Sequence, residues 1–343
     1  GPQVIHLGFE STPELTTGDV DGDGDVDVAI ARTKRTKRGI WWLENLGSSQ
    51  FSVPIDADGS TDQYLAVGTV HLVDSDRDAL PELVYTVAEN GVWIQIQPNL
   101  GGSFGEPTRL RSQADEVAIT DMDRDAQAHL LTGDDGFPST VGWIAGLGDG
   151  SFDYPASTAT SGPSWTEAAD VDADGVPDLV TRGSYDDSSF AVQLGAGDGT
   201  FGPAVPYEFG AYGSAEPTLG DMDGDGDLDV VLGCTNPSGP DTVVVLRGLG
   251  DGSFGSPEPY PAQGVGWGGG VYLADLDSDG DLDVLALTSW GSLLLRRGAG
   301  DGTLLGLQLV AEGVFRVLSL GDVDEDGHLD CIYGTLQSGI GTV

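Results

Sequence analysis

The chain has 343 residues, and its 56 acidic side chains against 14 basic ones give a formal net charge of −42. Such a surface repels phosphate backbones, so we expect no nucleic acid among its partners. No stretch approaches 18 consecutive apolar residues, so we expect no membrane insertion.

An acidic nine-residue phrase, Asp-x-Asp-x-Asp-Gly-x-x-Asp in its fullest form, recurs seven times along the chain. The copies, loops one to seven, are residues 19–27, 74–82, 121–129, 170–178, 221–229, 275–283 and 322–330. Their starts lie 47 to 55 residues apart. A fixed period near 50 residues indicates a repeat architecture.

Each repeat is interpreted as four short strands. In one repeat, residues 215–220 lead into loop five, and apolar runs follow at 228–232 and 243–246. A second motif, Gly-Leu-Gly-Asp-Gly-Ser-Phe-Gly at 248–255, precedes a last short run toward Tyr260. Related motifs occur in other repeats. Their glycines permit a tight turn, and we expect the Phe to pack between neighbouring repeats.

The pattern predicts an all-β fold: a single seven-bladed β-propeller with four antiparallel strands per blade. Residues 2–7 resemble the fourth-strand segments, and the seventh repeat stops inside its third strand. We therefore expect the N-terminal strand to close the last blade. The expected blades are residues 9–57, 58–111, 112–157, 158–208, 209–262, 263–311, and 312–343 together with 1–8.

The acidic loops predict Ca²⁺ sites. Carboxylates at positions 1, 3, 5 and 9 converge when a glycine at position 6 lets the chain turn sharply, and a backbone carbonyl at position 7 can complete the set. Hard oxygen ligands in a flexible loop suit Ca²⁺ better than Mg²⁺. An EF-hand is excluded because it needs Glu at position 12, where loop one has Ile30. Solvated acidic turns without metal are the alternative.

Five to seven Ca²⁺ ions are expected. The expected ligands are Asp19, Asp21, Asp23, Asp25 and Asp27; Asp74, Asp76, Asp78, Leu80 and Glu82; Asp170, Asp172, Asp174, Val176 and Asp178; Asp221, Asp223, Asp225, Asp227 and Asp229; Asp275, Asp277, Asp279, Asp281 and Asp283; and Asp322, Asp324, Asp326, His328 and Asp330.

Loops two and three depart from the pattern. Loop two keeps its four carboxylates but has Ala79 at the turn, so we expect it to bind with strain. Loop three has Ala126 at the turn and His129 in place of the last acid, so we expect it to be weak or empty. We do not expect His129 to bind a transition metal, because the neighbouring hard carboxylates select for other ions.

The acidic loops alternating with Gly-Asp-Gly-Ser-Phe-Gly turns resemble the FG-GAP repeats of the integrin α-chain propeller. They are also similar to related bacterial repeats and to fungal lectins built on a seven-bladed ring. The resemblance covers essentially the whole chain and implies structural Ca²⁺ in the loops of one face, with recognition of an external ligand by another surface. It does not imply a membrane receptor function.

A ligand surface is expected on the face opposite the acidic loops. Five aromatic residues fall in segments of blades four to six that belong to this face: Trp165, Tyr185, Tyr212, Trp267 and Trp290. Flat aromatic faces suit the stacking of sugar rings, and packing between blades is the alternative for each residue. The basic segment 32–38 lies on the same face, where it is either a site for an anionic glycan or acidic protein patch or a solvated hairpin tip.

We therefore expect a calcium-stabilised, secreted or cell-surface recognition module that is not an enzyme. Its partner is expected to be a glycan, as for a lectin, or an extracellular protein, as for an adhesive module. A propeller enzyme acting on polysaccharide, of lyase or dehydratase type, and a protein-adhesion scaffold are the alternatives. Extracellular location follows from the weak Ca²⁺ affinity typical of extracellular modules. We expect a monomer with two buried thiols, Cys234 and Cys331.

Overall fold

The computed structural model describes residues 4–5, 14–32, 39–46, 50–57, 66–88, 92–112, 116–133, 141–153, 156–158, 165–182, 188–210, 212–214, 216–235, 240–262, 264–265, 270–322, 328–335 and 339–342. The regular elements of this part of the chain are all β-strands. These residues include no helix that is long and apolar enough to cross a membrane.

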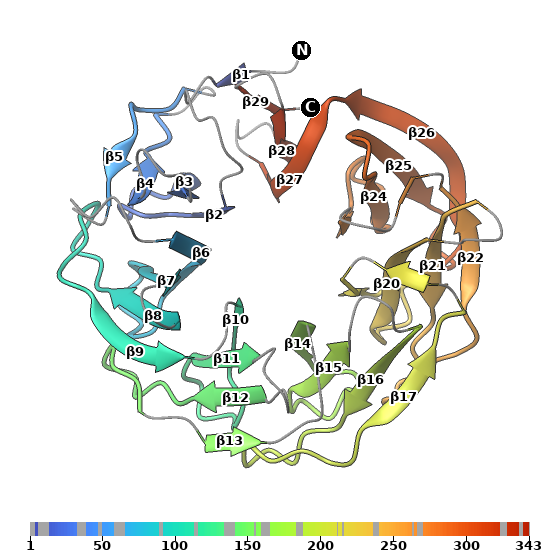
Figure 1. Ribbon diagram of the computed structural model, residues 1–343, viewed down its shortest axis with the longest axis horizontal. Helices are drawn as coiled ribbons and strands as arrows, with labels where there is room; N and C mark the ends of the chain where they lie inside the picture. Colours follow the sequence, from blue (N-terminus) through green and yellow to red (C-terminus); the bar gives the residue numbers. More distant parts are fainter. Residues whose placement is uncertain are drawn as a thin grey trace.

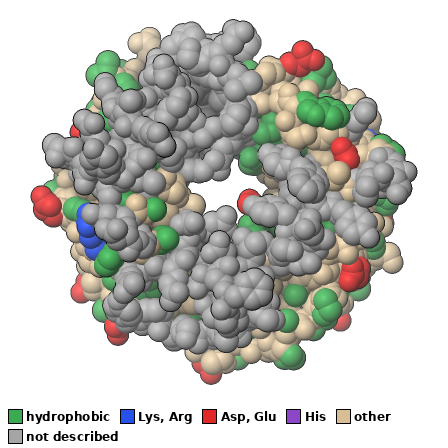
Figure 2. All heavy atoms as spheres, viewed as in Figure 1, with side chains coloured by type: hydrophobic (Ala, Val, Ile, Leu, Met, Phe, Trp, Pro, Cys, Tyr) green, Lys and Arg blue, Asp and Glu red, His purple; other side chains and the backbone are tan. Residues whose placement is uncertain are grey.

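The strands form seven antiparallel sheets arranged as the blades of a ring (Figure 1). In the space-filling view the ring has an opening at its centre (Figure 2). Within each blade the strands follow one another from the centre to the rim. The prediction of an all-β, seven-bladed propeller is confirmed.

Blade one contains β2 (Glu14–Gly18), β3 (Asp27–Arg32), β4 (Gly39–Leu43) and β5 (Ile55–Asp56). Blade two contains β6 (Ala66–Val73), β7 (Glu82–Ala88), β8 (Val92–Gln97) and β9 (Thr108–Ser112). Blade three contains β10 (Glu116–Thr120), β11 (His129–Gly133), β12 (Val141–Ile144) and β13 (Ala156–Thr158). Blade four contains β14 (Trp165–Ala169), β15 (Asp178–Arg182), β16 (Ser189–Gln193) and β17 (Val205–Glu208).

Blade five contains β18 (Tyr212–Ser214), β19 (Thr218–Gly220), β20 (Asp229–Thr235), β21 (Thr242–Leu246) and β22 (Glu258–Pro261). Blade six contains β23 (Val271–Ala274), β24 (Asp283–Leu287), β25 (Ser292–Gly298) and β26 (Leu304–Glu312). Blade seven contains β27 (Val314–Gly321), β28 (Asp330–Thr335), β29 (Gly339–Thr342) and β1 (Val4–Ile5).

Blade five differs from the expected four strands, because its inner strand is split. Both β18 and β19 pair with β20, with a register irregularity between Tyr212 and Ser214. Pro217 lies between the two pieces and has no N–H to give to a ladder. A proline at this point accounts for the interruption.

The ring is closed by the N-terminal strand. In blade seven β1 pairs with β29, with Val4 opposite Gly341 and Ile5 opposite Ile340. Strands β27 of blade seven and β2 of blade one also contact each other. The predicted closure is confirmed, and it covers an edge of β29 that would otherwise be open.

The hydrophobic core lies between the blades. One buried cluster joins blades four and five, and it includes Val180 and Phe190 of the first and Val230 and Leu232 of the second. The middle strands β15 and β24 are buried along their whole length, because both faces of their sheets are covered. Cys234 and Cys331 are buried free thiols, as expected, and burial raises the pKa of each to about 12.

The Phe of the Gly-Asp-Gly-Ser-Phe turn packs between neighbouring blades, as predicted. Phe254 of blade five is buried in the cluster shared with blade four, where its ring meets Phe190 edge-on at 5.6 Å. The glycine of the same turn is needed for a close approach: a Cβ on Gly252 would lie 2.6 Å from Cδ2 of Leu194 in blade four. Packing between repeats therefore explains two residue types of this motif.

Candidate metal-binding hairpins

The acidic loops connect the first and second strands of the blades, next to the turns that connect the third and fourth strands. The carboxylate at position nine links the two. It is the first residue of the second strand, and it is buried in loops one, four, five and six, where it is Asp27, Asp178, Asp229 and Asp283.

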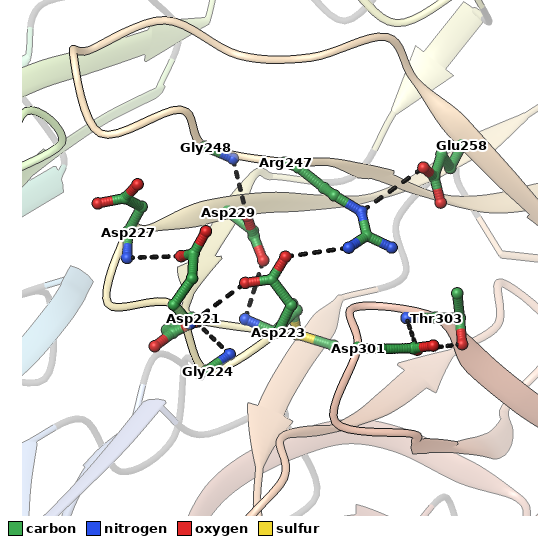
Figure 3. A network of polar contacts seen from close by, with 12 residues as sticks. Asp221, Asp223, Gly224, Asp227, Asp229, Arg247, Gly248, Glu258, Asp301 and Thr303 are labelled. Carbon is green, nitrogen blue, oxygen red and sulfur yellow. Dashed lines mark hydrogen bonds and ion pairs between the residues drawn. The ribbon is translucent and has the colours of Figure 1, made fainter.

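Each of these four carboxylates accepts two backbone N–H groups. In loop five, Asp229 Oδ2 accepts from Met222 at 2.9 Å and Oδ1 accepts from Gly248 at 2.7 Å (Figure 3). The same pair of hydrogen bonds is made by Asp27, Asp178 and Asp283. Position nine therefore clamps the acidic loop to the neighbouring turn. Sequence reasoning assigned it a metal-binding role and missed this structural one.

The carboxylate at position one organises the turn itself. Asp221 Oδ1 accepts the Gly224 N–H at 2.7 Å and its Oδ2 accepts the Gly226 N–H at 3.0 Å. Position six has a positive φ in loops one to six, which confirms the expected sharp turn there. Position four also has a positive φ in these loops, including at Arg124 and Ser278, and this was not anticipated.

Carboxylate oxygens converge in several loops. In loops one and four, oxygens from positions one, three and nine lie within 4.8 Å of one another, and in loops two and five the same holds for positions one, three and five. In loop four, Asp170 Oδ1 is buried without a hydrogen-bond partner. A buried anionic oxygen that faces two more acceptors lacks a compensating positive charge. A hard divalent cation would supply it, so these residues fit Ca²⁺.

Burial, with a smaller contribution from neighbouring carboxylates, raises the pKa of the acid at position nine in several loops. Burial raises the pKa of Asp27 and of Asp229 to about 6, although the backbone hydrogen bonds that these carboxylates accept lower it. The pKa of Asp178 and of Glu82 is also raised, first by burial. The charged form of these groups is therefore costly in the cation-free protein, and a bound cation would relieve the cost.

Loop three differs from the other loops in its donor set, because one of the three groups whose ligand atoms lie within 4.8 Å of one another, Asp121, Asp123 and His129, is an imidazole. His129 is fully buried, and its Nδ1 accepts the Met122 N–H at 3.0 Å. A nitrogen that accepts a hydrogen bond carries no proton, so the neutral ring places its proton on Nε2. This Nε2 lies 3.9 Å from Asp123 Oδ1 and from Asp125 Oδ1. The loop thus presents an N–H where the other loops present an acceptor, although Asp121 Oδ1 is also buried without a partner.

Loop two shares with these loops the hydrogen bond between positions two and nine, made here by a longer side chain. Glu82 Oε2 accepts both the N–H and the hydroxyl of Ser75 at 2.6 Å. Asp74, Asp76 and Asp78 lie close together, as a cation site requires. The strain expected at the turn is present, because Ala79 has φ 71°.

Replacing Ala79 by Gly is expected to stabilise the protein by about 1 kcal/mol, because an L-residue in the left-handed region costs on the order of 1–2 kcal/mol. Urea denaturation of the two proteins measures the difference. The mirror-image control is Gly24→Ala, whose Cβ would meet nothing within 4 Å, so that only the backbone conformation is changed. It should destabilise by a similar amount. Equal stabilities for Ala79→Gly and the parent would contradict the assigned strain.

Arginines near three of the loops were not anticipated as part of the site. Arg247 donates to Asp223 Oδ2 at 3.0 Å and also pairs with Glu258 (Figure 3). Arg297 contacts Asp283 and, at 3.3 Å, Asp277. Arg124 of loop three pairs with Asp174 of loop four at 3.2 Å. Each guanidinium offsets part of the local negative charge while leaving other carboxylate lone pairs free for a cation.

Loop seven is described only in part. Asp322, His328 and Asp330 belong to the described residues, and the proposed ligands Asp324 and Asp326 lie outside them. His328 is exposed, and its Nδ1 lies 3.3 Å from Ser278 Oγ of loop six.

The aromatic candidates on the opposite face do not form one group among the described residues. Trp165 is half-buried and packs against the cluster between blades four and five, which agrees with its alternative packing role. Trp290 has 73% of its surface exposed, at the tip of the hairpin between β24 and β25. Tyr212 lies on β18. Tyr185, Trp267 and most of the basic segment (33–38) lie outside the described residues.

The ring of blades and its repeated hairpins define a repeat β-propeller, an architecture of interaction and adhesion modules. A family model described as FG-GAP-like repeat matches residues 19–85, 170–232 and 221–286, which together span more than half of the chain. The chain therefore belongs to the FG-GAP-like repeat family. No curated protein matches the sequence significantly.

Several solved structures share the fold. The N-terminal part of BBS1 in complex with ARL6DN, soaked with lead, is 15% identical with a TM-score of 0.57 over 96% of this chain and 91% of that one. The same complex soaked with mercury is 14% identical, with a TM-score of 0.56 over 96% of this chain and 90% of that one. The Dos1 propeller is 11% identical with a TM-score of 0.55 over 92% of this chain and 75% of that one. At such identities the similarity concerns the fold alone.

Proposed function

We propose that the chain is a calcium-stabilised recognition module that acts outside the cell or at its surface, with structural Ca²⁺ in the acidic hairpins and a binding surface on the opposite face. The observation that carries the proposal is the repeated convergence of three carboxylates within 4.8 Å, with a buried unpartnered oxygen on Asp170 in loop four.

The ligands proposed for Ca²⁺ are the carboxylates at positions one, three, five and nine and the carbonyl at position seven. Position nine can serve both as clamp and as ligand, because each carboxylate oxygen has two lone pairs and the N–H groups use only some of them. Ca²⁺ tolerates the irregular geometry that such shared ligands impose. The ion would lock the hairpins and thereby the ring, so its binding energy becomes folding energy.

A protein partner is the first candidate for the binding surface. The chain belongs to a family of interaction propellers, and the BBS1 propeller with a similar fold was crystallised in complex with ARL6DN. We propose binding and not catalysis, because the clustered carboxylates already accept hydrogen bonds from backbone N–H groups and so have a structural role. An enzyme acting on polysaccharide would need further catalytic groups in the centre or on the opposite face.

A glycan is the second candidate, favoured by Trp290. The hairpin that carries this residue is fastened to residue 264 by the hydrogen bond from Ser289 N–H to Gly264 O at 2.9 Å. The indole lies against Gly264, where a Cβ would stand 3.0 Å from Trp290 Cε3. A rigidly held, exposed indole is a suitable platform for a sugar ring.

A glycan array probed with Ca²⁺-loaded protein separates the candidates. If a glycan binds, Trp290→Ala should lower its affinity at least about tenfold, the loss expected for ~1.4 kcal/mol of stacking. Leu249→Ala is the matched control, because Leu249 is a 59% exposed apolar residue in a turn of the acidic face. The Leu249→Ala protein should bind the glycan as tightly as the parent.

Other outcomes favour the other functions. Capture of a protein that sugars do not compete away would favour the adhesion scaffold. Release of unsaturated products from a polysaccharide would contradict the proposal of a binding module and favour the lyase alternative.

A further inference from the structure

One position beside the acidic loops differs in charge from blade to blade. The carboxylate at position nine accepts the N–H of Asn45 in blade one, of Gly248 in blade five and of Gly298 in blade six. The residue that directly precedes this N–H, here called the pre-turn residue, is Glu44, Arg247 and Arg297 respectively. Loops five and six therefore have a basic residue at a position where loop one has an acid.

In blade five the pre-turn residue reaches the converging carboxylates. Oxygens of Asp221, Asp223 and Asp225 lie within 4.8 Å of one another. Arg247 Nη1 donates to Asp223 Oδ2 at 3.0 Å (Figure 3). The side chains of this pair are 27% and 17% exposed, so water screens their charges incompletely. The guanidinium thus already neutralises part of the charge that a divalent cation would neutralise.

Arg247 is held beside the loop by its own blade and by the next one. Its Nε pairs with Glu258 Oε1 at 3.5 Å (Figure 3). The turn of blade six packs against it, because a Cβ on Gly302 would stand 2.7 Å from Arg247 Cζ. The Gly302 N–H also donates to Met222 O of loop five at 3.1 Å. These contacts keep the guanidinium close to loop five when an ion binds there.

Blade six repeats the arrangement, and blade one does not. Arg297 Nη1 contacts Asp283 at position nine and lies 3.3 Å from Asp277 Oδ2 at position three. In loop one, the converging carboxylates of Asp19, Asp21 and Asp27 accept backbone N–H groups. Within the described part of the chain, no basic side chain pairs with these three.

We propose that Arg247 and Arg297 are built-in counter-ions, which support their hairpins without Ca²⁺ and weaken Ca²⁺ binding to loops five and six relative to loop one. The inference rests on the proposed calcium sites and divides them into two classes. A unit positive charge roughly 6 Å from a divalent ion repels it even at the dielectric constant of water. The expected loss of affinity is about tenfold, which corresponds to ~1.4 kcal/mol.

Loops one and five provide a matched comparison inside one molecule. Both have aspartate at positions one, three, five, seven and nine and glycine at positions four and six. They differ only at positions two and eight, where both have apolar residues. A difference in their Ca²⁺ affinity therefore reports on their surroundings and not on their own ligands.

Hydrogen exchange measured by mass spectrometry at a series of free Ca²⁺ concentrations resolves the loops. Peptides that contain residues 19–27, 221–229 and 275–283 report on loops one, five and six. Protection of loop one should be half complete at a Ca²⁺ concentration at least about tenfold lower than for loops five and six. In chelator, loops five and six should exchange more slowly than loop one. Equal midpoints for loops one and five would overturn the inference.

Arg247→Gln tests the guanidinium itself. Its loop five should exchange faster in chelator and yet reach half protection at about tenfold less Ca²⁺ than in the parent. A merely structural role would speed the exchange without lowering the Ca²⁺ midpoint. Arg247→Lys keeps the charge and should keep the midpoint of the parent. Arg297→Gln is the matched control, because it should lower the midpoint of loop six and leave that of loop five unchanged.

The outcomes separate this inference from the proposed function. Protection of the loops by Ca²⁺, with the loop-five midpoint of Arg247→Gln equal to that of the parent, would overturn the inference alone. If Ca²⁺ protected none of the loops, the calcium sites and the inference would both be wrong.

Discussion

Removal of Ca²⁺ by a chelator is expected to lower the melting temperature of the protein by at least about 10 °C. An ion present at a hundredfold excess over its dissociation constant stabilises the folded state by about 2.7 kcal/mol, and several loops would contribute. Without the ion, two carboxylates about 6 Å apart at an effective dielectric constant of 20 repel each other by roughly 3 kcal/mol. Differential scanning calorimetry of the chelated and the reloaded protein measures the change.

The choice of ion provides the control for this experiment. Mg²⁺ should restore less of the lost stability than Ca²⁺, because it requires near-octahedral geometry and gives up its waters reluctantly. Elemental analysis of the untreated protein should find Ca²⁺ in an amount close to the number of intact loops. An unchanged melting temperature together with the absence of bound Ca²⁺ would contradict the assignment and favour solvated acidic turns.

Replacing Asp229 by Ala is expected to destabilise the protein by on the order of 3 kcal/mol, with or without Ca²⁺. The substitution leaves the N–H groups of Met222 and Gly248 without their acceptor in a buried position. Each buried donor that loses its partner costs about 1–3 kcal/mol. Denaturant unfolding of both proteins, in Ca²⁺ and in chelator, gives the comparison.

Asp225→Ala distinguishes the clamp from the cation site. Asp225 is exposed, and its Oδ1 accepts only the nearby Asp227 N–H at 2.9 Å. This variant should lose stability in Ca²⁺ but be close to the parent in chelator, whereas Asp229→Ala should be weakened in both. If both variants were affected only in Ca²⁺, position nine would be a metal ligand without a structural role.

The repeat period was enough to predict the seven blades, and the turn chemistry was enough to predict their strand order. Closure by the N-terminal strand was also predictable, because residues 2–7 have the pattern of a fourth strand and blade seven lacked one. The glycine at position six announced a positive φ, which is a local property of the backbone. These features are readable because they depend on neighbours in the chain.

The clamping role of position nine could not be read from the motif. An aspartate at this position reads as a metal ligand, and only the fold brings Asp229 next to Gly248, nineteen residues away. Arg247 follows the third strand of blade five and Arg297 lies near the end of the third strand of blade six. Neither belongs to a motif, yet both reach the acidic loops of their blades. The positive φ at position four was not predicted, because Arg and Ser, found there as Arg124 and Ser278, rarely adopt a left-handed backbone conformation.

By itself, the sequence determined the repeat, the all-β class and the placement of acidic residues at hairpin turns, since periodicity, strand preference and glycine are local signals. Tertiary structure alone decided which carboxylates are buried, which of them accept hydrogen bonds from a neighbouring turn, and which hydrophobic residues stay exposed. Burial depends on the neighbouring blade, so Phe254 is covered while the leucines of β26 face solvent. No local pattern encodes that difference, because it arises when the blades splay apart from the centre of the ring to its rim.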